Sequence, residues 1–536
     1  MDKNIKKINA RTIILTILFV LILVVIALLI GKFSYSYLAP TVSDDVEGAG
    51  EVTASGDTII FTKGNTLSLS ANTDNFKTNG GNLTATTNPK VKLMASSKTN
   101  GASSKYYVGV HIKDNNYTYS TTSKTSEIIL TIKDEKGNEV TSVGGLTYTT
   151  SGGVSGFDVT NKSGLYDIDL SHTIATTSSS SEIIHTWTFT LTFINLETDQ
   201  SVNENSKMNI EIYLMKEKPI STVADVCSGG KTLASCVTTL KEKDTFGVAN
   251  IYHHDGTLEN GINDGSYRFA GTSEKVNNFV CFGSDAESCP TDNLYRIIGV
   301  IDGKVKLIKY DYATSTLLGI DGDYYGQYTT GSLNYKGNNY ANISSYYWNN
   351  ATQKNTWSES LLNKTNLNTN FITNIGSTWA NKIAITTWKV GGNINSKIRD
   401  VVPSVSYQNE IVNPVTTNTT DNATEYVSRV GLMYVSDYGF AANPSFWTYP
   451  MRDSSDSPKD YRVATTANWM YMGLDEWTIS RDANSMYGVL FVMNLGGVHS
   501  FNSKLTSAIR PSFYLESSVT YVSGSGTSTD PIRISL

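Results

Sequence analysis

The amino-acid sequence predicts a multidomain chain with an N-terminal transmembrane helix, an all-β sandwich and a C-terminal α+β domain. Three observations lead to this fold class. Residues 12–30 carry no charge, alternating apolar residues recur between residues 56 and 216, and seven of the eight tryptophans lie after residue 245. A chain of 536 residues is too long for one hydrophobic core, so we expect several domains.

The N-terminal segment has the composition of a membrane anchor. Residues 1–11 form a short basic tail, and residues 12–31 are rich in Ile, Leu and Val. About 20 apolar residues in a helix span the hydrocarbon core of a bilayer. Basic residues before the span and acidic residues after it predict a cytoplasmic N-terminus, with the bulk of the chain outside the cell. The membrane is then a partner through residues 12–31, and a cleaved signal peptide is the alternative.

A linker over residues 32–55 leads to the predicted β-sandwich over residues 56–216. Its strongest strand signal is the sequence HTWTFTLTF, in which apolar residues alternate with threonines. The apolar members of this pattern are Trp187, Phe189, Leu191 and Phe193. Apolar residues at every second position lie on one face of a strand, so this pattern predicts a sheet that packs against the core on one side. Many such strands predict two sheets packed together.

Residues 217–244 are predicted to be a connector, and residues 245–536 an α+β domain. Asp302–Gly303 is a hairpin turn signal between two apolar runs. Thr356 and Glu359 have the spacing of a capping box, which predicts the start of a helix. Residues 427–442 have the composition of a buried strand, and residues 487–501 that of a hairpin.

The four cysteines form two local pairs along the sequence. Cys227 and Cys236 lie in the connector, and Cys281 and Cys289 lie in the last domain. Outside the cell such pairs predict disulfides, whereas a zinc site normally has tighter ligand spacing. Four cysteines allow three connectivities, and we expect pairing of neighbours.

The C-terminal region resembles a known family. The stretch WMYMGLDEWTISR and the stretch from AIRPSFYL to DPIRI are similar to those of uncharacterised bacterial surface proteins. The last domain of that family resembles the C-type-lectin-like fold, which formylglycine-generating enzymes share. The resemblance implies this fold for residues 245–536, and the sandwich resembles camelysin-type secreted proteins. The chain has no cysteine after Cys289, so the oxidation chemistry of formylglycine-generating enzymes is not expected.

Other chemistry has little support in the sequence. No basic stripe is present, so nucleic acid is not an expected partner. His253 and His254 are neighbours, which point to opposite faces of a strand, so we predict no metal site there. Asp475 and Glu476 diverge for the same reason, so they do not form the convergent carboxylate pair of a glycosidase. No cofactor is predicted.

Ligand binding is the favoured activity of the last domain. Aromatic rings stack on sugars and peptides, and polar neighbours supply hydrogen bonds. The candidate ligand-binding residues are Trp477, Arg481, Tyr487, Asn494, His499, Phe501 and Asn502. The alternative is that most of these aromatic residues belong to the core. Phe501 lies among polar residues, so we expect it to be exposed.

We therefore predict a cell-surface protein that presents an adhesin-like recognition domain to an external glycan or protein ligand. A structural envelope or fibre component is one alternative, because a β-sandwich could polymerise. A cell-surface hydrolase is the other alternative. The prediction is that the protein is not an enzyme.

Overall fold

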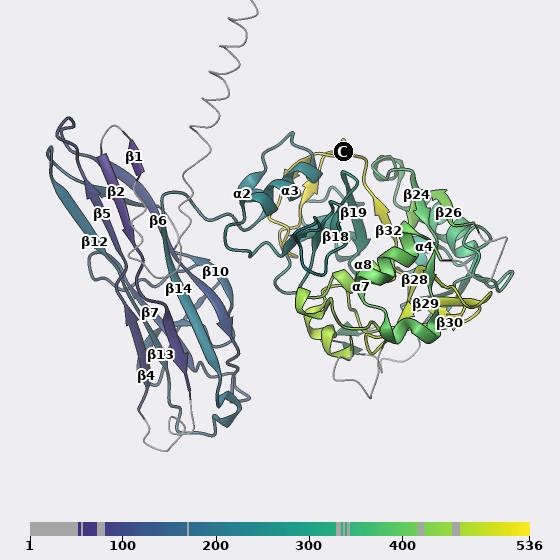
Figure 1. The fold of residues 1–536 in the computed structure, drawn as a ribbon, viewed down its shortest axis with the longest axis horizontal. Coiled ribbons are helices and arrows are strands. Elements are labelled where there is room, and N and C mark those ends of the chain that lie inside the picture. The colour runs from purple at the N-terminus through teal and green to yellow at the C-terminus, as the bar shows by residue number, and fades with distance from the viewer. Residues whose placement is uncertain are drawn as a thin grey trace, which may run out of the picture. The chain divides into compact units, whose positions relative to one another are not determined.

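The computed structural model describes residues 52–54, 57–71, 81–168, 171–327, 334–335, 338–339, 343–415, 423–452 and 461–536 (Figure 1). The chain divides into two compact units, the first ending at Lys218 and the second beginning at Pro219. Each unit has its own hydrophobic core, so each is described by itself.

The fold class predicted from the sequence is wrong and is corrected to a mostly β-sheet chain. Only 17 % of the structure is helical. The described residues include no helix that is both long and apolar enough to cross a membrane. The helix predicted for residues 12–31 and the tail over residues 1–11 lie outside the described residues, as does most of the linker over residues 32–55. The second unit contains short helices between its strands, and these helices do not form a separate layer.

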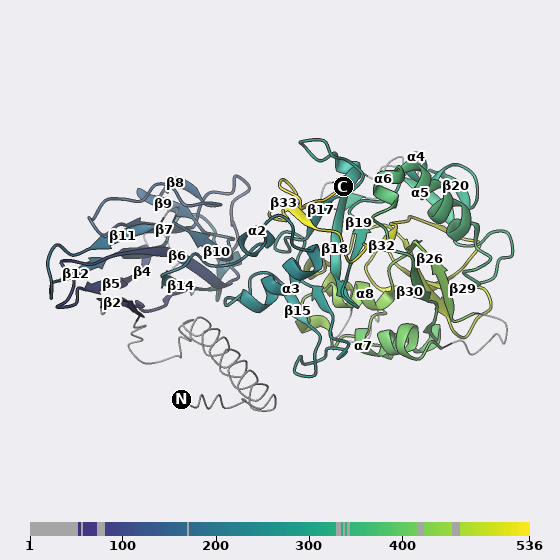
Figure 2. The same ribbon diagram turned by 90° about the horizontal axis from the view of Figure 1, so that it is seen from above.

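The first unit is built from three antiparallel sheets, and its β-sandwich is confirmed. Figure 2 shows its strands in stacked layers. One sheet contains β1 (Val52–Ala54), β2 (Asp57–Thr62), β5 (Lys90–Met94) and β12 (Glu182–Thr186). A second contains β3 (Leu67–Ser70), β6 (Ser103–Asn115), β10 (Gly164–Asp167), β11 (His172–Ala175) and β14 (Lys207–Met215). The third contains β4 (Leu83–Thr87), β7 (Ile128–Lys133), β8 (Thr147–Ser151), β9 (Val154–Asp158) and β13 (Thr188–Phe193).

The alternating pattern that predicted the sandwich also sets its core. β13 pairs with β4 on one side and β7 on the other, so both of its edges are satisfied. Trp187, Phe189, Leu191 and Phe193 are all fully buried. They join Met208 and the other inward residues of β14 in one core, as period two requires of a sheet packed on one face. A 3₁₀ turn, η2, covers Ser201–Asn203.

The second unit is organised around one sheet of seven described strands. This sheet contains β15 (Ile251–His253), β16 (Tyr267–Phe269), β17 (Phe279–Cys281), β18 (Leu294–Ile301), β19 (Lys304–Lys309), β27 (Val430–Gly431) and β32 (Ser512–Tyr514). The hairpin predicted at Asp302–Gly303 is confirmed, because β18 and β19 pair across it. Both turn residues have positive φ, which an Asp–Gly pair tolerates.

Smaller sheets surround the seven-stranded one. One contains β20 (Tyr324–Gln327), β23 (Ser344–Tyr347) and β31 (Thr506–Ser507), and another contains β25 (Gly392–Asn393), β28 (Glu476–Asp482), β29 (Gly488–Val492) and β30 (Val498–Asn502). The two-stranded pairs are β21 (Asn334–Tyr335) with β22 (Asn338–Asn339), β24 (Thr386–Lys389) with β26 (Glu425–Ser428), and β33 (Tyr521–Ser523) with β34 (Arg533–Ile534).

The helices of the second unit are short. The α-helices are α2 (Val223–Val226), α3 (Leu233–Lys243), α4 (Ser315–Leu318), α5 (Ile372–Asn374), α6 (Ser377–Ala380), α7 (Pro403–Tyr407) and α8 (Val435–Phe440). The 3₁₀ helices are η3 (Thr291–Asn293), η5 (Asn395–Asp400), η7 (Pro444–Phe446) and η8 (Tyr461–Ala467), and the π-helices are η4 (Leu362–Phe371) and η6 (Gln408–Val412). Residues 427–442, expected as one buried strand, divide among the end of β26, β27 and α8, because a short apolar run is compatible with either state.

The predicted connector, residues 217–244, contributes to the core of the second unit. Helix α3 buries Leu233, Val237 and Leu240 against the seven-stranded sheet, and Val223 of α2 joins them. The spacing of four and then three residues puts these side chains on one helix face. This packing favours a domain boundary at Pro219, whereas the sequence suggested residue 245.

The two predicted disulfides are confirmed. Cys227 pairs with Cys236, with 5.4 Å between their Cα atoms, and Cys281 pairs with Cys289 at 5.8 Å. Each bridge closes a small loop within the second unit. In the entropic account, closing loops of this size restricts the unfolded chain by about 2–3 kcal/mol each.

The core position of α3 yields a test of the boundary. We expect a fragment of residues 219–536 to unfold cooperatively, and a fragment of residues 245–536 to be insoluble or to unfold without a sharp transition. The shorter fragment lacks four buried aliphatic side chains, each worth about 1.5–3 kcal/mol. That sum is comparable to the whole stability of a typical domain, about 5–15 kcal/mol. Thermal unfolding followed by circular dichroism checks this, and equal melting temperatures would contradict it.

Candidate functional site

The candidate ligand-binding residues fall on one sheet and its turns. In the order β25, β28, β29 and β30, strand β28 is central and β30 is an edge strand within the described chain. The hairpin predicted at residues 487–501 is confirmed, because β29 and β30 pair from Gly488 with Asn502 to Val492 with Val498. The position of each residue in this sheet determines whether its side chain can contact a ligand.

Trp477 and Arg481 are in the interior and are not brought to the surface. Every residue of β28 is buried, and the Trp477 indole N–H donates to the carbonyl of Tyr346 at 3.0 Å. The Arg481 guanidinium donates to the carbonyls of Val390 and Ala423, and burial lowers its pKa to about 10. These two residues position the sheet and have no access to an external ligand.

His499 and Phe501 lie on one face of β30. The Phe501 ring stacks on the buried Phe491 ring with 4.0 Å between centroids, and the His499 ring lies 6.5 Å from Phe501. A guanidinium nitrogen of Arg452 lies 3.2 Å from Nε2 of His499. The expectation that Phe501 is an exposed loop residue is wrong, because it is half-buried in a strand and packs on the core.

Tyr487 and Asn502 lie together at the end of the sheet where the turn over residues 483–487 joins β28 to β29, the tip of the β28–β29 hairpin. The carbonyl of Tyr487 accepts from the N–H of Ser503 at 2.8 Å, which ties the two chain segments together. Met486 and Leu505 flank them, and we call this group, Met486, Tyr487, Asn502 and Leu505, the hairpin tip. Its three apolar members are exposed, at 39 % for Met486, 47 % for Tyr487 and 43 % for Leu505.

Asn494 lies in the turn that joins β29 to β30. Its N–H donates to Oδ1 of Asp475 at 2.7 Å, and its carbonyl accepts from the hydroxyl of Tyr471. The structure thus separates the candidate residues into four places: the core pair, the β30 face with His499 and Phe501, the hairpin tip, and the turn with Asn494. Met486 and Leu505 were missed because isolated aliphatic residues carry no local signal of exposure.

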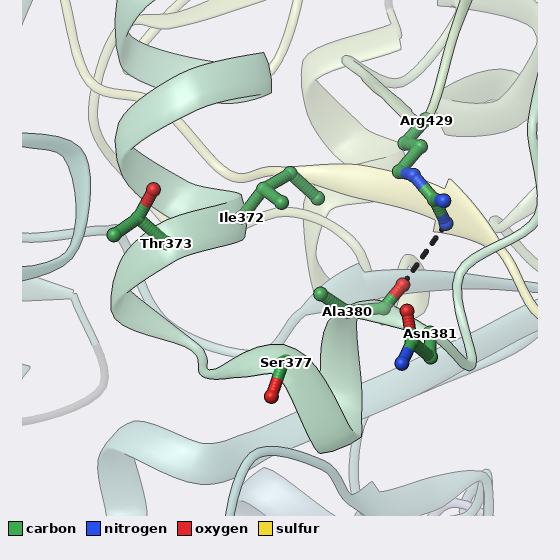
Figure 3. Close-up of a pocket in the computed structure, with 6 residues that line it drawn as sticks. All are labelled: Ile372, Thr373, Ser377, Ala380, Asn381 and Arg429. Atoms are coloured by element: carbon green, nitrogen blue, oxygen red, sulfur yellow. Dashed lines mark hydrogen bonds between the residues drawn. The ribbon is translucent and has the colours of Figure 1, made fainter.

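A shallow hollow of about 340 Å³ lies elsewhere in the second unit (Figure 3). It is lined by Ile372, Thr373, Ser377, Ala380, Asn381 and Arg429. Arg429 donates to the carbonyl oxygens of Ala380 and Ile383 at 3.1 and 2.6 Å, so part of its guanidinium holds the backbone in place. Three of the lining residues, Thr373, Ser377 and Asn381, are exposed, so the hollow encloses little and does not define a ligand.

The acidic and histidine residues considered for chemistry are engaged in the fold. Glu476 forms two hydrogen bonds with the buried Arg510, both at 2.8 Å. His254 is fully buried against Phe440 and Trp447, and burial lowers its pKa to about 3. No group of three or more His, Cys, Asp or Glu in the described ranges is placed to hold a metal ion.

A buried charged cluster lies between the seven-stranded sheet and α8. Oδ2 of Asp437 accepts from Nζ of Lys306 at 2.5 Å, and Oδ1 accepts from Arg268 at 3.0 Å. Arg268 also lies 3.3 Å from Asp264. All of these side chains except that of Asp264 are almost fully buried, and the two cations hold the pKa of Asp437 below its usual range despite that burial.

Glu410 borders the same cluster. Its carboxylate accepts from the N–H groups of Val435 and Ser436 at 3.0 Å each, at the start of α8, and from the hydroxyl of Ser480. Burial raises the pKa of Glu410 to about 6, although these hydrogen bonds act in the opposite direction. This carboxyl group can therefore take up and release a proton near neutral pH.

No protein-family model, curated protein or solved structure matches this chain. The resemblance to the C-type-lectin-like and camelysin-type families thus stays a prediction from sequence motifs. The function must be argued from the side chains themselves.

Neighbouring substitutions on β30 test which side chains the core depends on. We expect Phe501→Ala to lower the free energy of unfolding by about 2 kcal/mol, roughly half the cost for a fully buried phenylalanine, because Phe501 is half-buried. Asn502→Ala is the matched control on the opposite face of the strand, and it should cost less than about 0.5 kcal/mol. Urea denaturation of both variants measures this, and equal stabilities would contradict the stacking on Phe491.

The raised pKa of Glu410 predicts a dependence of stability on pH. The folded state holds this proton more tightly than the unfolded state does, so the free energy of unfolding falls as pH rises from about 4.5 to about 6. The fall attributable to Glu410 is about 2 kcal/mol. Glu410→Gln cannot titrate, so the stability difference between the two proteins should change across this window. Denaturation at a series of pH values checks this, and a constant difference would contradict it.

Proposed function

We propose that this protein is an exported surface protein whose second unit binds an external ligand through the hairpin tip. The observation that carries the proposal is the exposure of Met486, Tyr487 and Leu505 near the turn that joins β28 to β29. Exposed apolar groups beside polar ones are typical of recognition surfaces, and aromatic rings are enriched among residues that dominate binding.

The chemistry of the hairpin tip fits a glycan or a polar peptide. Tyr487 offers a flat ring and a hydroxyl group in one side chain. The side-chain oxygen of Asn502 accepts from the N–H of Lys504 at 3.1 Å, and its NH₂ group is a hydrogen-bond donor. A ring with a nearby amide donor can stack on one face of a sugar and bind its hydroxyl groups.

The disulfides support an extracytoplasmic location. Two pairs of cysteines are bridged in the second unit, and such bridges persist in oxidising compartments. The structural-fibre and hydrolase alternatives stay predictions from the sequence, and neither has a structural feature of its own in the described residues.

A binding experiment tests the proposal directly. Labelled full-length protein is applied to a glycan array and a peptide array, and the strongest ligand is then titrated. We expect Tyr487→Ala to weaken binding at least about tenfold, which corresponds to about 1.4 kcal/mol. The melting temperature should stay unchanged, because the ring is largely exposed.

The matched control is Tyr325→Ala, which removes another exposed tyrosine, at 62 %, from strand β20 of a different sheet. It should leave the affinity within about twofold of the parent protein. Equal affinity of the Tyr487→Ala variant and the parent would place the binding surface elsewhere. An absence of binding on both arrays would contradict the recognition function itself.

A further inference from the structure

The contact between Lys306 and Asp437 has the chemical partners of an amide bond. An amine nitrogen of strand β19 lies 2.5 Å from a carboxyl oxygen of helix α8, and both side chains are almost fully buried. The two residues are 131 positions apart in the chain. Figures 1 and 2 show α8 beside the sheet that contains β19.

The amine of Lys306 is enclosed by aromatic rings. Three rings face its Nζ atom, those of Tyr434 at 4.4 Å and of Trp388 and Tyr514 at 5.3 Å each. An ammonium ion has three N–H donors, yet Asp437 is the one hydrogen-bond acceptor that Nζ has in the described chain. Burial in this apolar setting lowers the pKa of Lys306, which increases the fraction of nucleophilic amine.

The carboxyl group of Asp437 is held for attack at its carbon atom. Arg268 donates to Oδ1 at 3.0 Å and the N–H of Tyr434 donates to Oδ2 at 3.0 Å. A cation on one oxygen polarises the carboxyl group and stabilises the negative charge that develops there when an amine attacks. Oδ2, beside the amine, is then the leaving oxygen.

We propose that Lys306 and Asp437 condense to an intramolecular amide bond that joins strand β19 covalently to helix α8. The Lys306 nitrogen attacks Cγ of Asp437, the C–N bond forms, and the C–Oδ2 bond breaks. The ammonium–carboxylate pair loses one oxygen and two hydrogens as a single water molecule. No oxidant or other reactant is needed.

The protons that this condensation requires come from the ammonium group of Lys306. An ionised Asp437 does not react with an amine, so Oδ2 must receive protons before it can leave. Oδ2 lies 2.5 Å from Nζ of Lys306, and the two protons that Nζ gives up leave with this oxygen as water. Glu410 is a positioning residue, because its carboxyl group binds the N–H groups of the two residues that precede Asp437 in α8.

Charge balance also favours the product. Condensation removes one positive and one negative charge from a water-excluded site, where separate charges are costly. Arg268 keeps Asp264 as its ionic partner at 3.3 Å, so no cation is left without a counter-charge. The new amide oxygen can accept the Arg268 hydrogen bond that Oδ1 accepts in the present arrangement.

Intact mass spectrometry of the full-length, disulfide-reduced protein tests the proposal. We expect a mass lower than that of the free sequence by one water, and a branched peptide that contains Lys306 and Asp437 after proteolysis. The unmodified mass in the parent protein would overturn the proposal, and this result does not depend on whether any variant folds.

Four variants identify the source of the mass loss. Lys306→Met removes the nucleophile and should show the unmodified mass. Asp437→Asn can still react by losing ammonia, so its product should have the same mass as the reacted parent protein. Lys309→Met, at a neighbouring buried lysine of β19, is the matched control and should retain the loss of water. Glu410→Gln should react more slowly, because one side-chain oxygen in place of two cannot accept from both N–H groups at the start of α8.

Two results of the variant series would count against the proposal. Asp–Gly dipeptides can lose water by forming a cyclic imide, and the chain has four of them, at residues 255–256, 264–265, 302–303 and 321–322. A water loss that persists in Lys306→Met would therefore overturn the assignment to Lys306. Condensation of the Glu410→Gln variant as fast as that of the parent protein would overturn the assigned role of Glu410.

Discussion

The carboxylate of Asp437 is the point at which the main elements of the second unit meet. It accepts from Arg268 of β16, from Lys306 of β19 and from the backbone at the start of α8. Burying these charges is costly, and removing one partner of such a cluster costs about 3–5 kcal/mol because the others remain unpaired. The cluster therefore contributes little to net stability. Its main effect is to favour the one arrangement of strand and helix in which every charge is paired. The rings of Trp388, Tyr434 and Tyr514 pack around it and exclude water.

The parts of the fold that were predictable are those set by neighbouring residues. The alternation of apolar and polar residues after Trp187 correctly predicted a strand of the sandwich, and Asp302–Gly303 correctly predicted a hairpin. Both signals depend only on residues close together in the sequence. The predicted α+β class failed because start signals are local and weak: the Thr356–Glu359 spacing leads only to a turn, and the helix begins later, at Leu362. The role of α3 was readable from the spacing of Leu233, Val237 and Leu240, yet the sheet that it covers is formed by residues far along the chain. The predicted membrane helix falls outside the described residues.

The candidate site shows the same division. Tyr487 is exposed, although the sequence placed it in the first strand of the hairpin, because β29 begins only at Gly488. Phe501 has polar neighbours in sequence, but in the structure its ring packs on Phe491 of the paired strand. The residues next to Phe501 in sequence do not show which strand it pairs with. Arg481 is buried because backbone carbonyls of Val390 and Ala423 satisfy it, and sequence alone does not reveal which carbonyls converge on a charge.

The order of strands in the main sheet governs how the protein can be made. β32, which ends at Tyr514, is inserted between β19 and β27, and it pairs with Lys306, Leu307 and Ile308 of β19. As a ribosome synthesises the chain, β19 emerges some 200 residues before the strand that covers its edge. During that interval its unpaired backbone groups are open to wrong partners, as exposed strand edges are in general. A product truncated before β32 would therefore keep these edge groups of β19 unpaired and open to association with other chains.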